Sequence, residues 1–224
     1  MELENIVPWG RNFAEYRDMF VLSGEDFQKR IVGCGDGPAS FNVEVTQMGG
    51  SVVSVDPIYA FSAEQIVGRI DEVAEVVMAQ VRQNAHHFVW KNIPDPDTLY
   101  TIRMEAMHRF LEDYETGKSA GRYVAGSLPE LSFDAGWFDL ALCSHLLFLY
   151  DKQLDLAFHE AAVLEMLRVA DEVRIFPLVT LENAPSPHLE PLMKRLTERG
   201  YLCEICQTNY EFQKGGDAML RIVS

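Results

Sequence analysis

The sequence predicts an α/β protein with a Rossmann-like three-layer sandwich, in which a seven-stranded, mostly parallel sheet lies between helices. Short apolar segments alternate with longer amphipathic ones along the 224 residues, as a parallel sheet with crossover helices requires. The first apolar segment runs directly into a loop with glycine at positions 33, 35 and 37, and the second ends at Asp56. We expect one domain over residues 1–224, an ordinary length for a single α/β domain.

The amino-terminal part supplies the first two strands. Residues 29–35 form a short apolar run that indicates a buried strand, and residues 51–56 form a second one. Residues 38–50 between them indicate a helix, since Pro38 suits a first helical turn and the glycines at 49 and 50 suit its end.

A helical insertion over about residues 62–120 is expected between the second and third strands. The connection is about twice the roughly 30 residues that a plain βαβ unit takes. Residues 62–88 carry apolar side chains every three or four positions, residues 92–97 interrupt the pattern with prolines, and residues 98–118 continue as a second helix. We expect one helix to make the crossover and the other to cover the sheet edge or its ligand-binding end.

The remaining elements complete the sheet, with the final strand antiparallel to the others. The segments predicted as strands are 121–128, 137–150, 171–179, 201–210 and 217–224, and those predicted as helices are 153–170 and 186–200.

Composition excludes several classes of partner. The chain has 34 acidic and 19 basic residues, for a formal net charge of −15 at pH 7. Such a surface repels phosphate backbones and anionic membranes, so we expect no nucleic acid and no membrane partner. No stretch reaches the roughly 18 apolar residues of a membrane helix. The first ten residues lack the basic-then-apolar order of a signal peptide, which predicts a cytoplasmic protein. The sequence indicates no oligomeric state.

One pair of cysteines and one pair of histidines could suggest metal or redox chemistry. Cys203 and Cys206 form a CxxC, but they lie in a predicted strand without a second ligand pair, which favours structural thiols. His86 and His87 are adjacent, without the helical i, i+4 spacing of a metal pair, which favours surface or lid histidines. We therefore predict no metal site.

The glycine loop and Asp56 together indicate a nucleoside-containing ligand. Glycines let a ligand approach the backbone closely, because no Cβ stands in the way. In open α/β sheets, ligands bind at the carboxyl ends of the strands, where Asp56 is also expected to lie. A carboxylate at that edge can accept hydrogen bonds from both hydroxyls of a ribose.

The loop sequence disfavours a dinucleotide. Counting from Gly33, the G-x-G-x-x-G/A pattern requires glycine or alanine at the sixth position, where Pro38 stands. Asp36 would also repel a pyrophosphate, whereas it would favour a ligand with a cationic end. No Gly-Lys-Ser/Thr follows the loop, which excludes a P-loop. S-adenosylmethionine fits these constraints, because it carries a ribose and a sulfonium and no phosphate.

The motifs resemble those of class I S-adenosylmethionine-dependent methyltransferases over nearly the whole chain. The resemblance rests on "IVGCGDGPAS" (31–40), "VDP" (55–57) and "AGSLPELSFDAGWFDLALCSHLLFLY" (125–150). It implies S-adenosylmethionine as the cofactor, with its methionine and ribose on the glycine loop, its ribose hydroxyls on Asp56 and its adenine against Ile58. The cofactor-binding residues that the resemblance implies are Gly33, Cys34, Gly35, Asp36, Gly37, Asp56, Pro57, Ile58, Ser127, Leu128, Cys143 and Ser144.

The resemblance places His145 beside the sulfonium and the acceptor, where two roles remain open. Its unperturbed pKa suits a general base, but it can equally be a half-buried histidine with its hydrogen bonds satisfied. Tyr150 is expected to be a packing residue. Trp9, Arg11 and Tyr16 either fold over the cofactor or acceptor, or belong to an amino-terminal helix packed on the sheet.

The function predicted is methyl transfer from S-adenosylmethionine to a small-molecule acceptor, by in-line attack of an oxygen, nitrogen or sulfur atom on the methyl carbon. Strand four and residues 62–120 are expected to shape the acceptor pocket. Two alternatives remain: a non-catalytic member that binds S-adenosylmethionine or a partner protein, and an NAD-dependent oxidoreductase.

Overall fold

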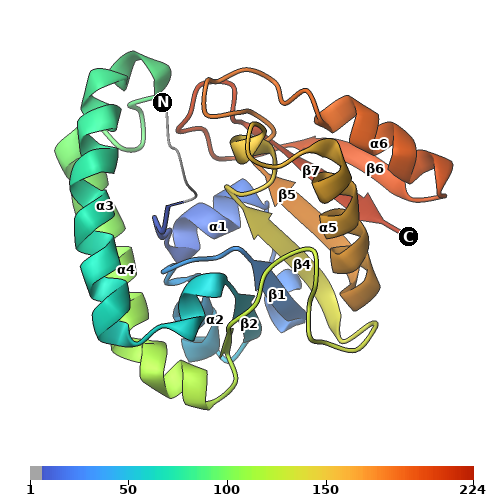
Figure 1. The fold of residues 1–224 in the computed structure, drawn as a ribbon, viewed down its shortest axis with the longest axis horizontal. Coiled ribbons are helices and arrows are strands. Elements are labelled where there is room, and N and C mark those ends of the chain that lie inside the picture. The colour runs from blue at the N-terminus through green and yellow to red at the C-terminus, as the bar shows by residue number, and fades with distance from the viewer. Residues whose placement is uncertain (1–6) are drawn as a thin grey trace.

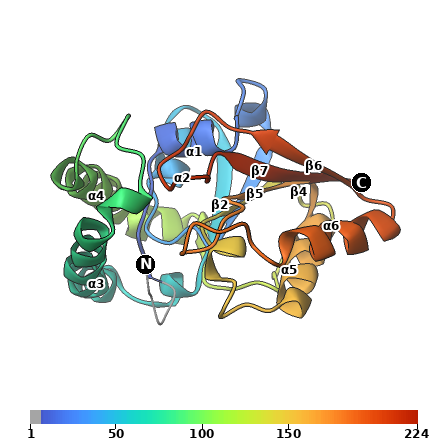
Figure 2. The same cartoon turned by 90° about the horizontal axis from the view of Figure 1, so that it is seen from above.

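The computed structural model describes residues 7–224 and confirms the three-layer sandwich (Figures 1 and 2). Its single sheet has seven strands in the order β3-β2-β1-β4-β5-β7-β6. The final strand, β7, is antiparallel to both of its neighbours, and the pairs formed by β1 to β5 are parallel. The strands are β1 Arg30–Cys34, β2 Ser51–Val55, β3 Tyr123–Val124, β4 Phe138–Ser144, β5 Ala170–Phe176, β6 Leu202–Gln207 and β7 Ala218–Val223. Residues 1–6, part of the segment tested for a signal peptide, lie outside the described residues.

Helices cover both faces of the sheet. Figure 2 shows α1 and α2 on one face, α5 and α6 on the other, and the α3–α4 pair beyond the β3 edge. The helices are α1 Phe13–Met19, α2 Phe41–Gln47, α3 Ala63–Gln83, α4 Pro96–Ser119, α5 Leu156–Val169 and α6 Leu189–Glu198. Among residues 7–224, none of these helices combines the length and the apolarity that crossing a bilayer demands.

Local sequence fixes where the two long helices begin. The Ser62 side chain accepts a hydrogen bond from the Gln65 amide, and Gln65 caps Ser62 in return, which starts α3 with a capping box. In α4, the Asp95 carboxylate accepts from the Thr98 amide and Pro96 occupies the first turn. The proline-rich segment predicted as a break thus ends in the cap of α4.

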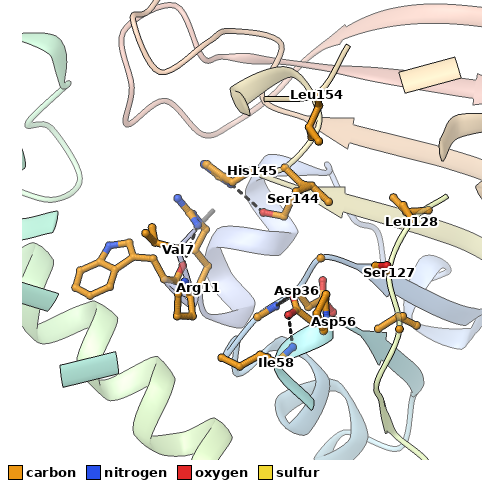
Figure 3. A pocket seen from close by; sticks show the side chains of 18 of the residues that line it. Val7, Arg11, Asp36, Asp56, Ile58, Ser127, Leu128, Ser144, His145 and Leu154 are labelled. Carbon is orange, nitrogen blue, oxygen red and sulfur yellow. Dashed lines mark hydrogen bonds between the residues drawn. The ribbon is translucent and has the colours of Figure 1, made fainter. Parts of the chain in front are cut away.

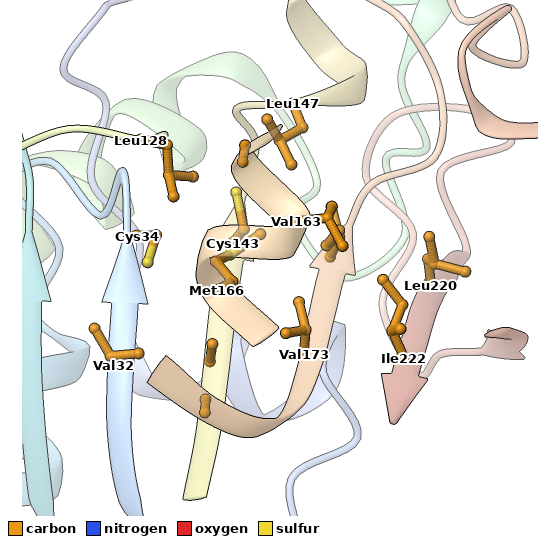
Figure 4. Close-up of a cluster of buried hydrophobic side chains, with 14 of the residues drawn as sticks. Val32, Cys34, Leu128, Cys143, Leu147, Val163, Met166, Val173, Leu220 and Ile222 are labelled. Atoms are coloured by element: carbon orange, nitrogen blue, oxygen red, sulfur yellow. The ribbon is translucent and has the colours of Figure 1, made fainter. Parts of the chain in front are cut away.

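Alternating side chains of the strands form two cores. On the α5 face, Val32, Cys143 and Val173 pack against Met166, as Figure 4 shows. On the α1 face, Leu142 belongs to a second cluster with side chains of α1 and α2. These two apolar layers hold the sheet rigid and fix where the carboxyl ends of the strands lie.

Two predicted strands are shorter than the sequence suggests. The third was predicted over 121–128, but only Tyr123 and Val124 pair with β2. The fourth was predicted over 137–150, but β4 stops at Ser144. His145 has a φ of 51°, a left-handed conformation that no strand continues, and residues 148–150 form a 3₁₀ turn. The apolar run after Ser144 therefore fills a buried turn.

The insertion covers both the edge of the sheet and its carboxyl end. Near β3, α3 and α4 share a cluster that includes Tyr59 and Tyr123. At its far end, the α3–α4 connection bonds to the β6–β7 connection: the Val89 amide donates to the Phe212 carbonyl at 2.7 Å, and the Lys214 amide donates to the His87 carbonyl at 3.0 Å. These bonds close a wall over one side of the strand ends.

Candidate functional site

A cavity of about 460 Å³ lies at the carboxyl ends of β1, β2 and β4 (Figure 3). Ligand sites commonly span about 300–1,000 Å³. The strand order changes direction between β1 and β4, which is the switch point where open α/β sheets bind ligands. Ten of the sequence-predicted site residues line the cavity: Gly35, Asp36, Gly37, Asp56, Pro57, Ile58, Ser127, Leu128, Ser144 and His145.

Three other residues of the predicted set do not line the cavity. The Cys34 and Cys143 side chains are fully buried in the core on the α5 face, because the alternation of side chains along a strand directs both of them onto that face. Burial raises the pKa of both thiols, which disfavours the reactive thiolate form. Gly33 leaves room for the Asp36 side chain instead, because a Cβ at this position would lie 1.9 Å from Oδ2 of Asp36.

Asp36 is a buried carboxyl group held by two hydroxyls. Its Oδ1 accepts a hydrogen bond from the Tyr16 hydroxyl at 2.8 Å, and its Oδ2 accepts one from the Ser54 hydroxyl at 2.6 Å. Burial outweighs these two bonds and raises the pKa of Asp36 to about 6. The carboxylate therefore stands in the wall of the cavity as a negative charge that a cationic ligand would stabilise.

Asp56 joins the end of β2 to the glycine loop. Its Oδ2 accepts a hydrogen bond from the Gly37 amide and its Oδ1 accepts one from the Ile58 amide, both at 2.9 Å. A carboxylate has about four lone-pair sites, so each oxygen can still accept a hydroxyl of a ligand. Figure 3 shows Ile58 and Ser127 on opposite sides of Asp56, which leaves a slot for a flat ring.

Three amides of the glycine loop and its junction with α2 are already used by the chain. The Gly35 amide donates to the Val55 carbonyl at 2.8 Å, and the Gly37 amide donates to Asp56. The Ser40 amide, just before α2, donates to the Arg11 carbonyl at 3.0 Å. A dinucleotide binds through free amides at the start of such a helix. These three amides are therefore not available to a pyrophosphate.

The segment before α1 covers the cavity, a feature that the predicted site set lacks. Val7, Pro8, Trp9 and Arg11 line the cavity together with Tyr16. The helix packed on the sheet is confirmed, and the Tyr16 hydroxyl of that helix reaches Asp36 in the cavity wall. A fold of this region over a cofactor or acceptor stays a prediction. The aromatic and cationic residues ahead of β1 were a partial signal for this cover. Other wall residues had no such signal: Phe61, Arg69, Leu146, Leu154 and Phe158.

His145 stands where β4 ends, at the boundary of the cavity. Its amide donates to the Phe176 carbonyl at 2.6 Å, and its Nδ1 shares a hydrogen bond of 2.9 Å with the Ser144 hydroxyl. Burial and the nearby guanidinium groups of Arg11 and Arg103 lower the pKa of His145 well below its usual value. The imidazole is therefore neutral at physiological pH, as a hydrogen-bonding group or a weak base.

A buried ion pair ties α1, which follows the covering segment, to α4. Arg103 of α4 donates to Oε2 of Glu15 at 2.5 Å, and the Tyr210 hydroxyl donates to Oε1 of Glu15 at 2.9 Å. Arg103 is only 1% exposed and Glu15 only 7%. Breaking such a pair leaves an uncompensated buried charge, so these contacts fix α1 relative to α4.

The metal and redox alternatives find no support. Cys203 packs toward the core on the α5 face and Cys206 toward the core on the α1 face, so the two side chains lie on opposite faces of the sheet. Within residues 7–224, no group of three or more histidine, cysteine, aspartate or glutamate side chains is arranged to hold a metal ion.

Sequence comparison identifies a relative over the whole chain. No family model matches. The chain is 31% identical over 223 residues to the uncharacterized protein MJ0045 of Methanocaldococcus jannaschii. The alignment covers 99% of this chain and 98% of that protein. The chain belongs to the MJ0045 family.

Structure comparison places this MJ0045 family member among methyltransferase folds. The N-methyltransferase NodS of Bradyrhizobium japonicum superposes with a TM-score of 0.51 at 13% identity, over 94% of each chain. Magnesium protoporphyrin IX methyltransferase of Synechocystis, solved with bound S-adenosylmethionine, matches at 16% identity over 87% of this chain and 69% of its own, with a TM-score of 0.45. The superposition on NodS shows that this chain has the Rossmann-like fold of that methyltransferase.

Proposed function

We propose that the protein binds S-adenosylmethionine in the cavity at the strand ends and transfers its methyl group to a small-molecule acceptor. Asp56 carries the proposal: it ends β2 beside the glycine loop, with lone pairs free to accept both ribose hydroxyls. The occupied loop amides favour a nucleoside without phosphates over NAD. The likeness of the fold to that of NodS, an N-methyltransferase, supports the same conclusion.

The residues around the cavity suit the two ends of this ligand. The slot between Ile58 and Ser127 would receive the adenine, and the end of β4 would lie near the sulfonium. Bound S-adenosylmethionine supplies an electrophilic methyl group. Asp36 would stabilise the positive charge on the donor side of the cavity. Ser144 and His145 would orient the acceptor, because alignment of the reacting atoms provides most of the acceleration in such a displacement.

The neutral imidazole also limits what acid–base help the site can give. Because the pKa of His145 is lowered, it can accept a hydrogen bond from an acceptor hydroxyl or amine, but it is a weak base for removing the proton. An acceptor whose nucleophile needs little deprotonation fits this site best.

A small acceptor fits the enclosure and the charge of the molecule. The covering segment and the α3 side of the cavity narrow the space around the donor. A net charge of −15 disfavours a nucleic acid substrate. The cytoplasmic location predicted from the sequence belongs to the same proposal.

Calorimetry with S-adenosylhomocysteine and NAD tests the cofactor. We expect S-adenosylhomocysteine to bind and NAD not to bind. Asp56→Ala should weaken S-adenosylhomocysteine at least tenfold, since a hydrogen bond to a charged group contributes about 1.5–3 kcal/mol. Asp139→Asn, a change in a partly exposed ion pair with Arg30, is the matched control. Unchanged affinity in Asp56→Ala and Asp56→Asn, both folded by circular dichroism, would remove Asp56 from the site.

A turnover assay separates an enzyme from a non-catalytic binder. Incubation of the protein with S-adenosylmethionine and a filtered metabolite extract should release S-adenosylhomocysteine, and incubation without the extract should not. Tight binding of the cofactor with no release from any extract would favour the non-catalytic alternative.

A further inference from the structure

A second, smaller cavity adjoins the proposed cofactor cavity. It has a volume of about 70 Å³ and shares Trp9, Arg11 and His145 with the first. Its other walls are mainly apolar and aromatic. They come from α3, the α3–α4 connection, the turn after β4, β5 and the β6–β7 connection: Val77, Val81, Phe88, Leu149, Phe176, Tyr210 and Phe212. A dry cavity of about 150 Å³ accommodates benzene. The smaller volume here suits one end of a molecule whose remainder lies in the first cavity.

Arg11 brings an unneutralised charge to this junction. Its Nη1 donates to the Trp9 carbonyl at 3.1 Å, and its buried Nε has no hydrogen-bond partner. Within residues 7–224, Arg11 forms no ion pair. Figure 3 shows its side chain extending toward His145. Burial and Arg103 lower the pKa of Arg11, which means that the cation gains stability from any anion beside it.

Two carboxylates in this region already have partners: Glu15, which acts electrostatically on Arg11, and Asp36, in the wall of the first cavity. Glu15 is bonded to Arg103 and to the Tyr210 hydroxyl, and Asp36 to the hydroxyls of Tyr16 and Ser54. Arg11 and Arg103 both line the second cavity, but Glu15 can balance only one of them. An excess positive charge therefore faces an apolar cavity inside a protein of net charge −15. Such a charge is costly unless a ligand neutralises it.

We propose that the methyl acceptor is a small organic acid with a planar, apolar body, and that Arg11 binds its carboxylate. This inference rests on the proposed function. The guanidinium fork suits a carboxylate, and the aromatic walls suit the edge of a ring or the end of a conjugated chain whose remainder lies in the first cavity. The nucleophilic atom lies beside His145, facing the methyl donor.

The same chemistry has a second possible source, because the cofactor itself carries a carboxylate on its methionine end. The two are separated with S-adenosylhomocysteine and 5′-methylthioadenosine, which lacks the amino acid end. We expect Arg11→Gln to bind both nucleosides as the wild type does. A loss of affinity for S-adenosylhomocysteine alone would assign Arg11 to the cofactor and overturn the proposal.

Acceptor probes complete the test. Ligand-observed NMR follows the titration of small aromatic acids into the S-adenosylhomocysteine complex. The acids are benzoate, phenylacetate and indole-3-acetate, and each is compared with its uncharged amide. At least one acid should bind tenfold or more tightly than its amide, and Arg11→Gln should abolish this preference. Arg30→Gln, an exposed arginine at the start of β1, should keep it.

The outcomes distinguish a failure of the proposed function from a failure of the acidic acceptor. Failure of the wild type to bind S-adenosylhomocysteine would count against the proposed function itself. Binding of that nucleoside with no preference for any acid over its amide, or with the preference intact in Arg11→Gln, would overturn only the acidic acceptor. Thermal unfolding of Arg11→Gln verifies that the variant is folded, and Arg11→Lys, which keeps the charge, should recover part of the preference.

Discussion

Replacing Asp36 by asparagine should make the ligand-free protein relatively more stable as the pH rises. Asp36 is 7% exposed, and its two oxygens accept hydrogen bonds from Tyr16 and Ser54. An asparagine keeps the shape of the side chain and one acceptor oxygen but never ionises. The wild type, by contrast, must hold a buried negative charge above a pKa of about 6.

The magnitude follows from the shift of this pKa. An unfolded aspartate titrates near 3.9, so the difference of about 2 in pKa, at about 1.36 kcal/mol for each unit, amounts to about 3 kcal/mol. Between these two pKa values the folded protein binds the proton and the unfolded chain does not, so stability falls as the pH rises and levels off above pH 6. About 1.4 kcal/mol of the effect lies between pH 5 and pH 8.

Urea unfolding at pH 5 and pH 8 measures this difference. The stability of Asp36→Asn relative to the wild type should rise by about 1.4 kcal/mol between the two pH values, whatever fixed cost the substitution carries. Asp139→Asn is the matched control, because Arg30 lowers the pKa of Asp139 and keeps it ionised over this range. A relative stability that stays flat, or that falls as the pH rises, would refute the buried-charge interpretation of Asp36.

Three further predictions concern the frame of the site. Gly33→Ala should destabilise the protein by about 3 kcal/mol in urea unfolding, because its Cβ would lie 1.9 Å from the Asp36 carboxylate. Gly68→Ala, in open space on α3, should be neutral or stabilising. Equal effects of the two substitutions would contradict the view that Gly33 makes room for Asp36. Glu15→Gln should cost about 3–5 kcal/mol by the same measurement, since it leaves a buried arginine uncompensated, and a loss below about 1 kcal/mol would contradict this. The ring resonances of His145 should not titrate between pH 8 and pH 6 in NMR spectra, because its pKa is lowered; a midpoint near 6.5 would refute its burial beside two guanidinium groups.

The sheet and its ligand end were predictable because their signals are local. Apolar periodicity gave the strands and the insertion, and parallel strands necessarily bring the glycine loop and Asp56 to one edge. Strand lengths were less predictable, since the apolar run after Ser144 is equally suited to a strand or a buried turn. The left-handed backbone of His145 decided between them.

The finer chemistry of the site depends on contacts distant in sequence. The sequence assigned Gly33 to the ligand, but its space is filled by the Asp36 carboxylate three residues on. The thiols of Cys34 and Cys143 were placed at the site by position along the motif, although strict strand alternation would have pointed them into the core. The lowered pKa of His145 comes first from burial and then from arginines of α4 and of the segment before α1, which no local pattern brings together.

The position of Trp9 gives the molecule a built-in optical reporter. The chain contains three tryptophans, and Trp9 alone among them lines both cavities. An adenine or an aromatic acid entering either space would change the polarity around that indole and quench or shift its emission. With phenylalanine at positions 90 and 137, the remaining fluorescence would follow occupancy in real time, so a ligand search could proceed without labels.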